Sequence, residues 1–366
     1  MASTCNELLE YCLRGEPWPG SLLDRALAVD EGRALLSVVV ERLGDLFEPR
    51  LCDTYDKLFM QAIERVTPEL KPRIRRPGKP HAAPDAPERV YVLSRVTLGA
   101  DVAVSSVMID AAKRRYPRAE IIFVGPRKCY ELFEHDARVR HLPAPYARNG
   151  TLVERLHASA ALWIDDGIVI DPDSRLSQLG LISVCEESRY FLFPSRSYGG
   201  EGLERLPVLA AQWAREVFGV RGARQYVAPL PATGERADIT VSLGVGENEA
   251  KRIGGDFERD LLHSLAASGA SVLVDKGGSA EERERVERAL PPGVRTHEGA
   301  FAPFAAQIAR SKQFVGYDSA GGHVASAASV PVISIAKGFA SERMAARWRP
   351  LGTVLNQEQA TYTFRR

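Results

Sequence analysis

The chain has little net charge, few cysteines and no apolar run long enough to cross a membrane. No window approaches the run of about 18 or more apolar residues that a transmembrane helix needs. The five cysteines are an odd number without a CxxC or a paired Cys/His spacing, which indicates reduced thiols rather than a zinc site. With 48 basic and 47 acidic residues the formal net charge is +1, so no global electrostatic term favours nucleic acid as a partner.

The N-terminal residues also lack the pattern of a secretory signal. The start MASTCNELLEYCLRGEPW carries acidic residues and has no basic region followed by an apolar core. We therefore expect a cytoplasmic protein, with peripheral contact to the inner face of a membrane left open. Lysine is scarce as well, since it supplies nine of the 48 basic residues, so a lysine beside glycines stands out.

Periodicity divides the 366 residues into a helical extension and two α/β halves. Residues 1–70 space their apolar side chains three and four apart, which predicts helices, and the proline-rich residues 71–88 predict a linker. Residues 89–225 and residues 236–350 each alternate strands with helices, a pattern typical of parallel sheets. Residues 351–366 read as a C-terminal tail. We expect an α/β fold with two Rossmann-like domains that face a central cleft.

Three glycine-containing turns follow predicted strands, at the sheet edge where parallel α/β proteins bind ligands. The first, VTLGADV, places Asp101 at a helix start, where its carboxylate either caps the helix or faces the cleft as a base. The second, LGVGENEAKR, contains Gly244 and Gly246. It ends in Lys251 and Arg252, which are either two cations for a diphosphate or a solvated basic pair.

The third turn, YDSAGGH, opens a helix of small residues. Asp318 and Ser319 are good N-cap residues. Gly321 and Gly322 would let a ligand approach the backbone, and His323 could donate to a phosphate oxygen. Free N–H groups and the positive end of the helix dipole favour an anion at such a helix start. An ordinary strand-to-helix turn with a structural histidine is the simpler alternative.

Taken in order, these segments resemble glycosyltransferase family 9, the ADP-heptose:lipopolysaccharide heptosyltransferases, which have the GT-B fold. The likeness covers roughly residues 89 to 352. Four segments carry it: LGADVAVSSVMIDAAKRRYPRAEIIFVG, SLGVGENEAKRIGGDF, DSAGGHVASAASVPVISI and RWRPLG. The third of these is similar to the family signature D-[ST]-G-x-x-H, which a small-residue helix and a VP-strand follow.

The resemblance implies an inverting transfer of heptose from an ADP-linked donor to an acceptor hydroxyl, without a metal or other cofactor. Residues 89–225 would form the acceptor domain and residues 236–350 the donor domain. The resemblance makes Asp101 the general base. The implied donor-binding residues are Gly244, Gly246, Lys251, Arg252, Asp318, Ser319, Gly321, Gly322 and His323. The acceptor would be a hydroxyl-bearing partner such as a lipid-linked saccharide or a protein.

Alternatives stay open for the base, the metal and the activity. Ala100 separates the glycine from the aspartate of the family's GD pair, and four aspartates near a predicted strand end are alternative bases: Asp165, Asp166, Asp171 and Asp173. The sequence DPD has the DxD spacing of a metal site, but a turn is the simpler interpretation.

The activity has alternatives as well. The interruption by Ala100 also suits a nucleotide-sugar binding module without catalysis, and a nucleotide-sugar epimerase could share this architecture. The helical extension could bind a partner or shape the acceptor site.

Overall fold

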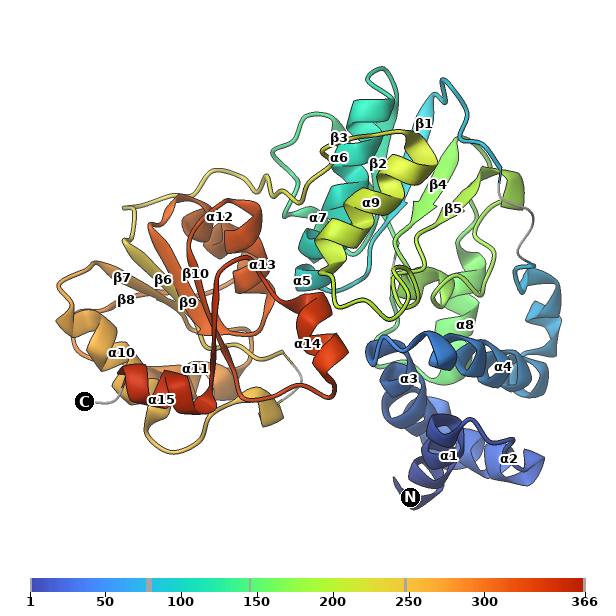
Figure 1. The fold of residues 1–366 in the computed structure, drawn as a ribbon, viewed down its shortest axis with the longest axis horizontal. Helices are drawn as coiled ribbons and strands as arrows, with labels where there is room; N and C mark the ends of the chain where they lie inside the picture. Colours follow the sequence, from blue (N-terminus) through green and yellow to red (C-terminus); the bar gives the residue numbers. More distant parts are fainter. Residues whose placement is uncertain (1, 77–80, 145, 247–248, 365–366) are drawn as a thin grey trace.

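The computed structural model describes residues 2–76, 81–144, 146–246 and 249–364. They form a helical extension and two α/β domains, each built on a parallel sheet (Figure 1). The fold class predicted from the sequence is therefore confirmed. Among the described residues, no helix has both the length and the apolar character that crossing a membrane would require.

The helical extension packs its apolar face against the first domain. Its buried side chains form one cluster with Leu152, Leu179 and Ile182 of that domain. The extension comprises α1 (Ala2–Arg14), α2 (Gly20–Ala28), the 3₁₀ turn η1 (Val29–Gly32), the π-helical segment η2 (Leu35–Val40), α3 (Glu41–Asp45), α4 (Pro49–Val66) and the 3₁₀ turn η3 (Pro68–Arg73).

The predicted linker begins as a docked segment. Ile74 forms an antiparallel bridge with Ile182, and the Arg75 guanidinium donates to the Gly180 carbonyl at 2.7 Å. Residues 71–76 thus lie fixed against the first domain rather than crossing the surface. Residues 77–80 of the predicted linker lie outside the described residues.

The first domain has the strand order β3-β2-β1-β4-β5, with every pairing parallel. Strand β4 is buried over its whole length, as expected for a sheet with helices on both faces. The elements are β1 (Arg89–Leu93), α5 (Leu98–Ala100), the π-helical η4 (Asp101–Ser105), α6 (Ser106–Arg115), β2 (Glu120–Gly125), α7 (Arg127–Tyr130), β3 (Val139–Pro143), α8 (Leu152–Ala161), β4 (Ile168–Asp171), η5 (Arg175–Ser177), η6 (Glu187–Arg189), β5 (Tyr190–Leu192) and α9 (Leu206–Phe218).

The second domain has the parallel strand order β11-β10-β9-β6-β7-β8. Its elements are β6 (Ile239–Ser242), η7 (Glu249–Lys251), α10 (Phe257–Ala267), β7 (Val272–Asp275), α11 (Ala280–Ala289), β8 (Arg295–His297), α12 (Phe301–Arg310), β9 (Gln313–Tyr317), α13 (Ala320–Ala327), β10 (Val332–Ala336), α14 (Glu342–Trp348), β11 (Thr353–Asn356) and α15 (Gln357–Phe364). The structure corrects the prediction that residues 351–366 form a C-terminal tail. Its strand β11 pairs with β10, and α15 packs on α10, because their apolar residues complete the second core.

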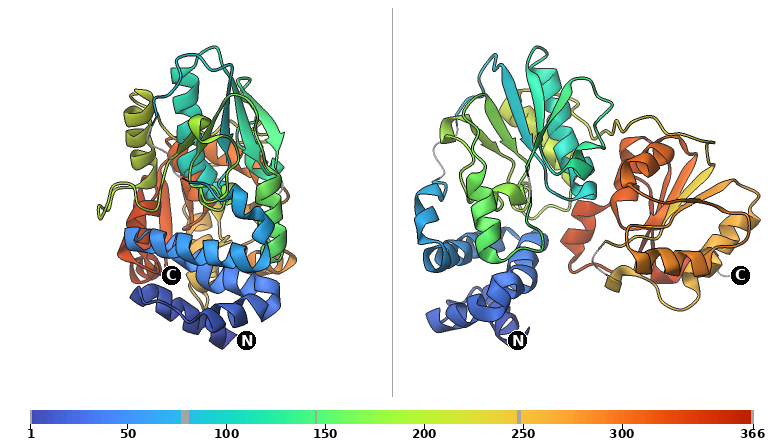
Figure 2. Two further views of the ribbon diagram at one scale, coloured as in Figure 1. Left: turned by 90° about the vertical axis from the view of Figure 1, so that its right-hand side faces the viewer. Right: turned by 180° about the vertical axis from the view of Figure 1, so that it is seen from behind.

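The two domains and the extension meet around α14. Figures 1 and 2 show this helix between the second domain and the other two parts. The α14 residue Arg343 binds Glu201 of the first domain at 2.7 Å. The ring of Phe47, just after α3, packs edge-on against Trp348 with ring centroids 5.7 Å apart. Phe47 is buried and has φ 56°, so a strained left-handed backbone is retained to point this ring inward.

We expect Phe47→Ala to lower the free energy of unfolding by about 3–5 kcal/mol, because a buried aromatic ring is removed. Phe47→Gly should be less destabilised than the alanine variant by roughly 1 kcal/mol, since glycine adopts a left-handed backbone without the penalty of a Cβ atom. Urea unfolding measures both changes. Tyr362→Ala, at a side chain that is 88% exposed, is the control and should unfold like the parent protein. Equal stability of the parent and Phe47→Ala would contradict this role for the ring.

Candidate functional site

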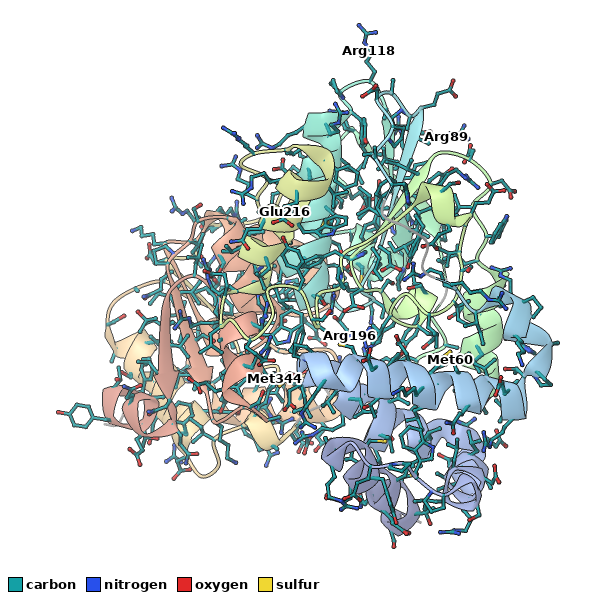
Figure 3. The ribbon with its side chains drawn as sticks, turned by 45° about the vertical axis from the view of Figure 1, so that its right-hand side comes forward. Met60, Arg89, Arg118, Arg196, Glu216 and Met344 are labelled. Carbon is teal, nitrogen blue, oxygen red and sulfur yellow. The ribbon has the colours of Figure 1, made fainter. Side chains whose placement is uncertain are left out.

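A cavity of about 660 Å³ lies where the two domains and the extension meet. The first domain contributes residues that follow β1 and β4, and the second contributes residues that follow β6 together with part of α14. In each sheet the strand order reverses at this edge, and open α/β sheets bind ligands at such points. Figure 3 labels Arg196 and Met344, which line the cavity from the first and second domains.

The cavity wall is rich in cationic side chains. Three carboxylates also line it: Glu41, Asp45 and Asp173. The cationic residues are Arg42, Arg95, Arg148, Arg175, Arg196 and Lys251. The surplus of positive charge favours an anionic ligand. The five arginines could not be found from the sequence, because they are spread over several loops and the extension and no motif separates them from the many other arginines.

Two of the predicted donor residues form an ion pair at the second-domain side of the cavity. The Lys251 ammonium lies 2.9 Å from Asp318 Oδ2 and 3.2 Å from the Asp318 carbonyl oxygen. This pair joins the second and third predicted turns, which follow the neighbouring strands β6 and β9. Arg252 instead binds Glu249 within its own turn at 3.2 Å. The structure therefore brings Lys251 and Asp318 together but does not place Arg252 on the cavity wall.

Packing requires one of the two α13 glycines, Gly321. A Cβ atom on Gly321 would lie 2.4 Å from Cζ of Phe314, inside the core. One on Gly322 would lie at an ordinary contact distance of 3.6 Å from the Pro350 ring, so packing does not require a glycine there, and the predicted ligand access at both glycines stays a prediction. Ser319 occupies the N-cap position, although its side chain makes no capping hydrogen bond within the described residues.

The glycines of the second turn differ from each other. Gly246 has φ 63°, which a residue without a Cβ atom adopts readily, and a Cβ atom there would meet no described atom within 4 Å. A Cβ atom on Gly244 would instead lie 2.9 Å from a Glu282 carboxylate oxygen. Gly246 thus permits the turn, whereas Gly244 makes room for a neighbour. Residues 247–248 of this turn lie outside the described residues.

His323 lies at the contact between the domains. Its ring centroid is 5.8 Å from that of Trp348, and a Cβ atom on Gly99 would lie 3.1 Å from its Cδ2 atom. Burial lowers the pKa of His323, with the nearby Asp318 carboxylate acting in the opposite direction. The imidazole is therefore neutral at pH 7, and it can donate a single hydrogen bond to an anion.

Trp348 connects the three parts of the site. Its ring contacts Phe47 of the extension and His323 of the third turn. The Arg95 guanidinium of the first domain lies 5.8 Å from the same ring in a cation–π arrangement. The tryptophan therefore fixes the distance between the first turn, the third turn and the end of α3.

Asp101, the predicted base, is fully buried. Its carboxylate accepts hydrogen bonds from Ser94 Oγ at 2.7 Å, the Arg95 backbone N–H at 2.7 Å and Ser105 Oγ at 2.6 Å. Burial raises the pKa of Asp101, and these hydrogen bonds oppose that rise. Ala100, and not Asp101, lines the cavity. The base role of Asp101 stays a prediction, but its geometry is that of a residue that holds the first turn in shape.

The alternative aspartates fall into separate places. Asp166 precedes β4 and binds Tyr91 and Arg89, so it lies at the opposite edge of the sheet from the cavity. Asp171 is fully buried, and burial raises its pKa although Ser177, Tyr190 and the Ser174 N–H donate to it. Asp173 does line the cavity.

Among the described residues, no three His, Cys, Asp or Glu side chains lie together in a way that could hold a metal ion. The DPD sequence forms a bend in which the first aspartate turns into the protein and the second, Asp173, has a left-handed backbone with φ 67°. The independence from metal remains a prediction.

Comparison with known proteins places the fold in one class. No family model and no curated protein sequence matches the chain. Solved structures do match the chain, and they include glycosyltransferases with the GT-B fold. The fold of this chain is therefore that of a GT-B glycosyltransferase.

Within that class the chain is similar to heptosyltransferases. The E. coli heptosyltransferase WaaC with ADP matches with a TM-score of 0.57 and 16% identity, over 75% of this chain and 97% of that one. The family 9 glycosyltransferase from Veillonella parvula matches with a TM-score of 0.52 and 15% identity, over 75% and 89% of the two chains. E. coli ADP-heptose lipopolysaccharide heptosyltransferase II gives 0.50 and 17%, over 74% and 93%. The predicted resemblance to the family 9 fold is confirmed.

We expect Asp101→Ala to lower the free energy of unfolding by about 2–4 kcal/mol, because two buried hydroxyls and a backbone N–H lose their acceptor. Thermal unfolding compares this variant with Asp53→Ala, which changes an exposed aspartate on α4. A parent-like melting temperature for Asp101→Ala would contradict the structural role described above.

The lowered pKa of His323 makes stability depend on pH. Below the ordinary histidine pKa of 6.5, the unfolded chain takes up a proton that the buried ring resists. The free energy of unfolding should therefore fall as the pH drops below about 6.5, by up to about 1.4 kcal/mol per pH unit from this residue. Denaturant unfolding between pH 4.5 and about 8 should show a smaller acid loss in His323→Gln than in the parent. Parallel curves for the two proteins would contradict the expectation.

Proposed function

We propose that this chain is a glycosyltransferase that moves a sugar from a nucleotide-sugar donor to an acceptor hydroxyl. The observation that carries the proposal is the Lys251–Asp318 pair, which stands beside the start of α13 and borders a cavity with a surplus of cationic side chains. The GT-B fold, shared with a heptosyltransferase whose structure contains ADP, supports the same conclusion. By that likeness we propose ADP-heptose as the donor.

In this proposal the donor diphosphate replaces Asp318 as the partner of Lys251. The lysine ammonium and the N-terminal N–H groups of α13 then offset the charge that grows on the diphosphate as its bond to the sugar breaks. Asp318 is freed to accept from a donor hydroxyl. Neutral His323 donates one hydrogen bond without adding a full charge.

A second cavity provides room for the rest of the donor. It has a volume of about 330 Å³ and is lined by Asp318, Ser334 and Arg349 on the side of α14 away from the main cavity. Phe339 borders both cavities. We assign the nucleoside to this side and the sugar to the main cavity.

The acceptor would enter from the arginine-bearing wall. Attack of its hydroxyl on the anomeric carbon, opposite the departing diphosphate, inverts the configuration at that carbon. The step needs a base for the hydroxyl proton but no metal, because cationic side chains offset the charge of the diphosphate. The arginines of this wall favour an acceptor that carries phosphate or carboxylate groups.

A nucleotide-sugar binding module without catalysis is the second candidate. The observation in its favour is that Ala100 faces the cavity while the neighbouring aspartate is buried. Release of ADP from ADP-heptose separates the two. A glycosyltransferase releases ADP in the presence of a suitable acceptor and slowly to water, whereas a binding module retains the intact donor.

We expect Lys251→Met to weaken ADP-heptose binding by about tenfold to a hundredfold, since a hydrogen bond to a charged group contributes about 1.5–3 kcal/mol. Isothermal titration calorimetry gives the dissociation constants. The matched control is Lys312→Met, because Lys312 binds Asp238 at 2.8 Å on the outer surface of the same domain and is well exposed. Equal affinity of the two variants would remove Lys251 from the donor site.

A further inference from the structure

The helical extension forms a fixed wall of the main cavity. Ser37, Arg42 and Asp45 are among the residues that it contributes. The Tyr55 hydroxyl donates to the Gln178 carbonyl at 3.3 Å, and the Arg175 guanidinium lies 3.0 Å from Asp45 Oδ1. These polar contacts and the shared apolar cluster fix the position of this wall relative to the first domain. A group on this wall can therefore be positioned as well as a group on the domain itself.

Two of the three carboxylates that line the cavity already bind side chains of the first domain. Asp173 is 1% exposed, and it accepts from Ser195 Oγ at 2.8 Å and from Arg196 Nε at 3.1 Å. Glu41 faces Arg155 at 3.5 Å. Asp45 differs, because its side chain is 55% exposed even with Arg175 bound to one oxygen. It is the cavity carboxylate with the most room for a substrate hydroxyl.

The position of Asp45 also suits a reaction at the donor turn. It is the last residue of α3, two residues before Phe47. The Phe47 ring contacts Trp348, which in turn contacts His323. This chain of contacts ties the end of α3 to the third turn, and Asp45 and Lys251 line the same cavity.

Arg175 orients the Asp45 carboxylate. The packing behind the pair is tight, since a Cβ atom on Gly44 would lie 3.3 Å from Leu179 Cδ1 and 3.9 Å from Arg175 Nη2. The arginine binds Oδ1, and the Asp45 side chain as a whole stays 55% exposed. An oriented carboxylate with one oxygen available is what a general base requires.

We propose that Asp45, supplied by the N-terminal extension, is the general base of the reaction. This inference rests on the proposed glycosyl transfer. The acceptor hydroxyl gives its proton to Asp45 while its oxygen forms the bond to the anomeric carbon. The bond between that carbon and the diphosphate oxygen breaks, and its electron pair leaves with the nucleoside diphosphate. The extension thus restores the carboxylate that Ala100 leaves out of the first turn.

The test compares Asp45→Asn and Asp45→Glu with Asp53→Asn, a change at an exposed aspartate of the same extension. The full-length proteins are given ADP-heptose, and ADP release to water and to a panel of saccharide acceptors is measured. We expect Asp45→Asn to reduce kcat by a factor of about 100 or more, the usual contribution of a general base. Its dissociation constant for ADP should match that of the parent. Asp45→Glu should recover part of the rate, and Asp53→Asn should behave as the parent.

The pH profile separates a base from a residue that only supports the fold. The acid limb of kcat/KM should disappear in Asp45→Asn and persist in Asp53→Asn. Rates within threefold of the parent in Asp45→Asn, or an unchanged acid limb, would overturn the assignment while leaving the proposed function standing. A parent protein that binds ADP-heptose but releases no ADP with water or any acceptor would overturn both.

Discussion

The packing of Trp348 among three neighbours is the constraint on which the site depends. Each Rossmann-like sheet leaves the carboxyl ends of its strands open, and a site forms when the two edges are held at a defined separation. Trp348 contacts His323, Phe47 and Arg95, one from each part of the molecule. Its helix is tied to the first domain through Arg343 and Glu201. The cavity geometry therefore follows from the contacts of one partly buried tryptophan.

Charge is distributed differently on the two sides of the cavity. On the second-domain side the one described lysine of the cavity wall already has Asp318 as a partner, so a ligand must compete with a carboxylate for it. On the opposite side several arginines surround a few carboxylates. The buried Arg347 on α14 belongs to neither group, and burial lowers its pKa to about 10. An anionic ligand that spans the cavity would offset charge on both sides, which favours binding between the domains over binding to either one.

Much of the fold could be predicted because its signals are local. Strand and helix periods, glycine turns and the small-residue helix each depend on a short stretch of sequence, and the VP-strand expected after the third turn appears as β10. The prediction of a C-terminal tail was wrong because β11 is short and half-buried, and its pairing with β10 is a tertiary contact. The π-helical turn at η4 could not be predicted from the apolar period, and it is this turn that carries Asp101 into the interior.

The sequence alone determined the order of strands and helices and the three turns at the sheet edges, because backbone propensity and apolar spacing act over a few residues. Tertiary structure decided which of these side chains face the cavity. It buried Asp101, turned Gly321 toward Phe314 and brought Asp45 from the extension to the cavity that Lys251 also lines. Those outcomes depend on packing between residues far apart in the chain, for which a single sequence contains no local signal.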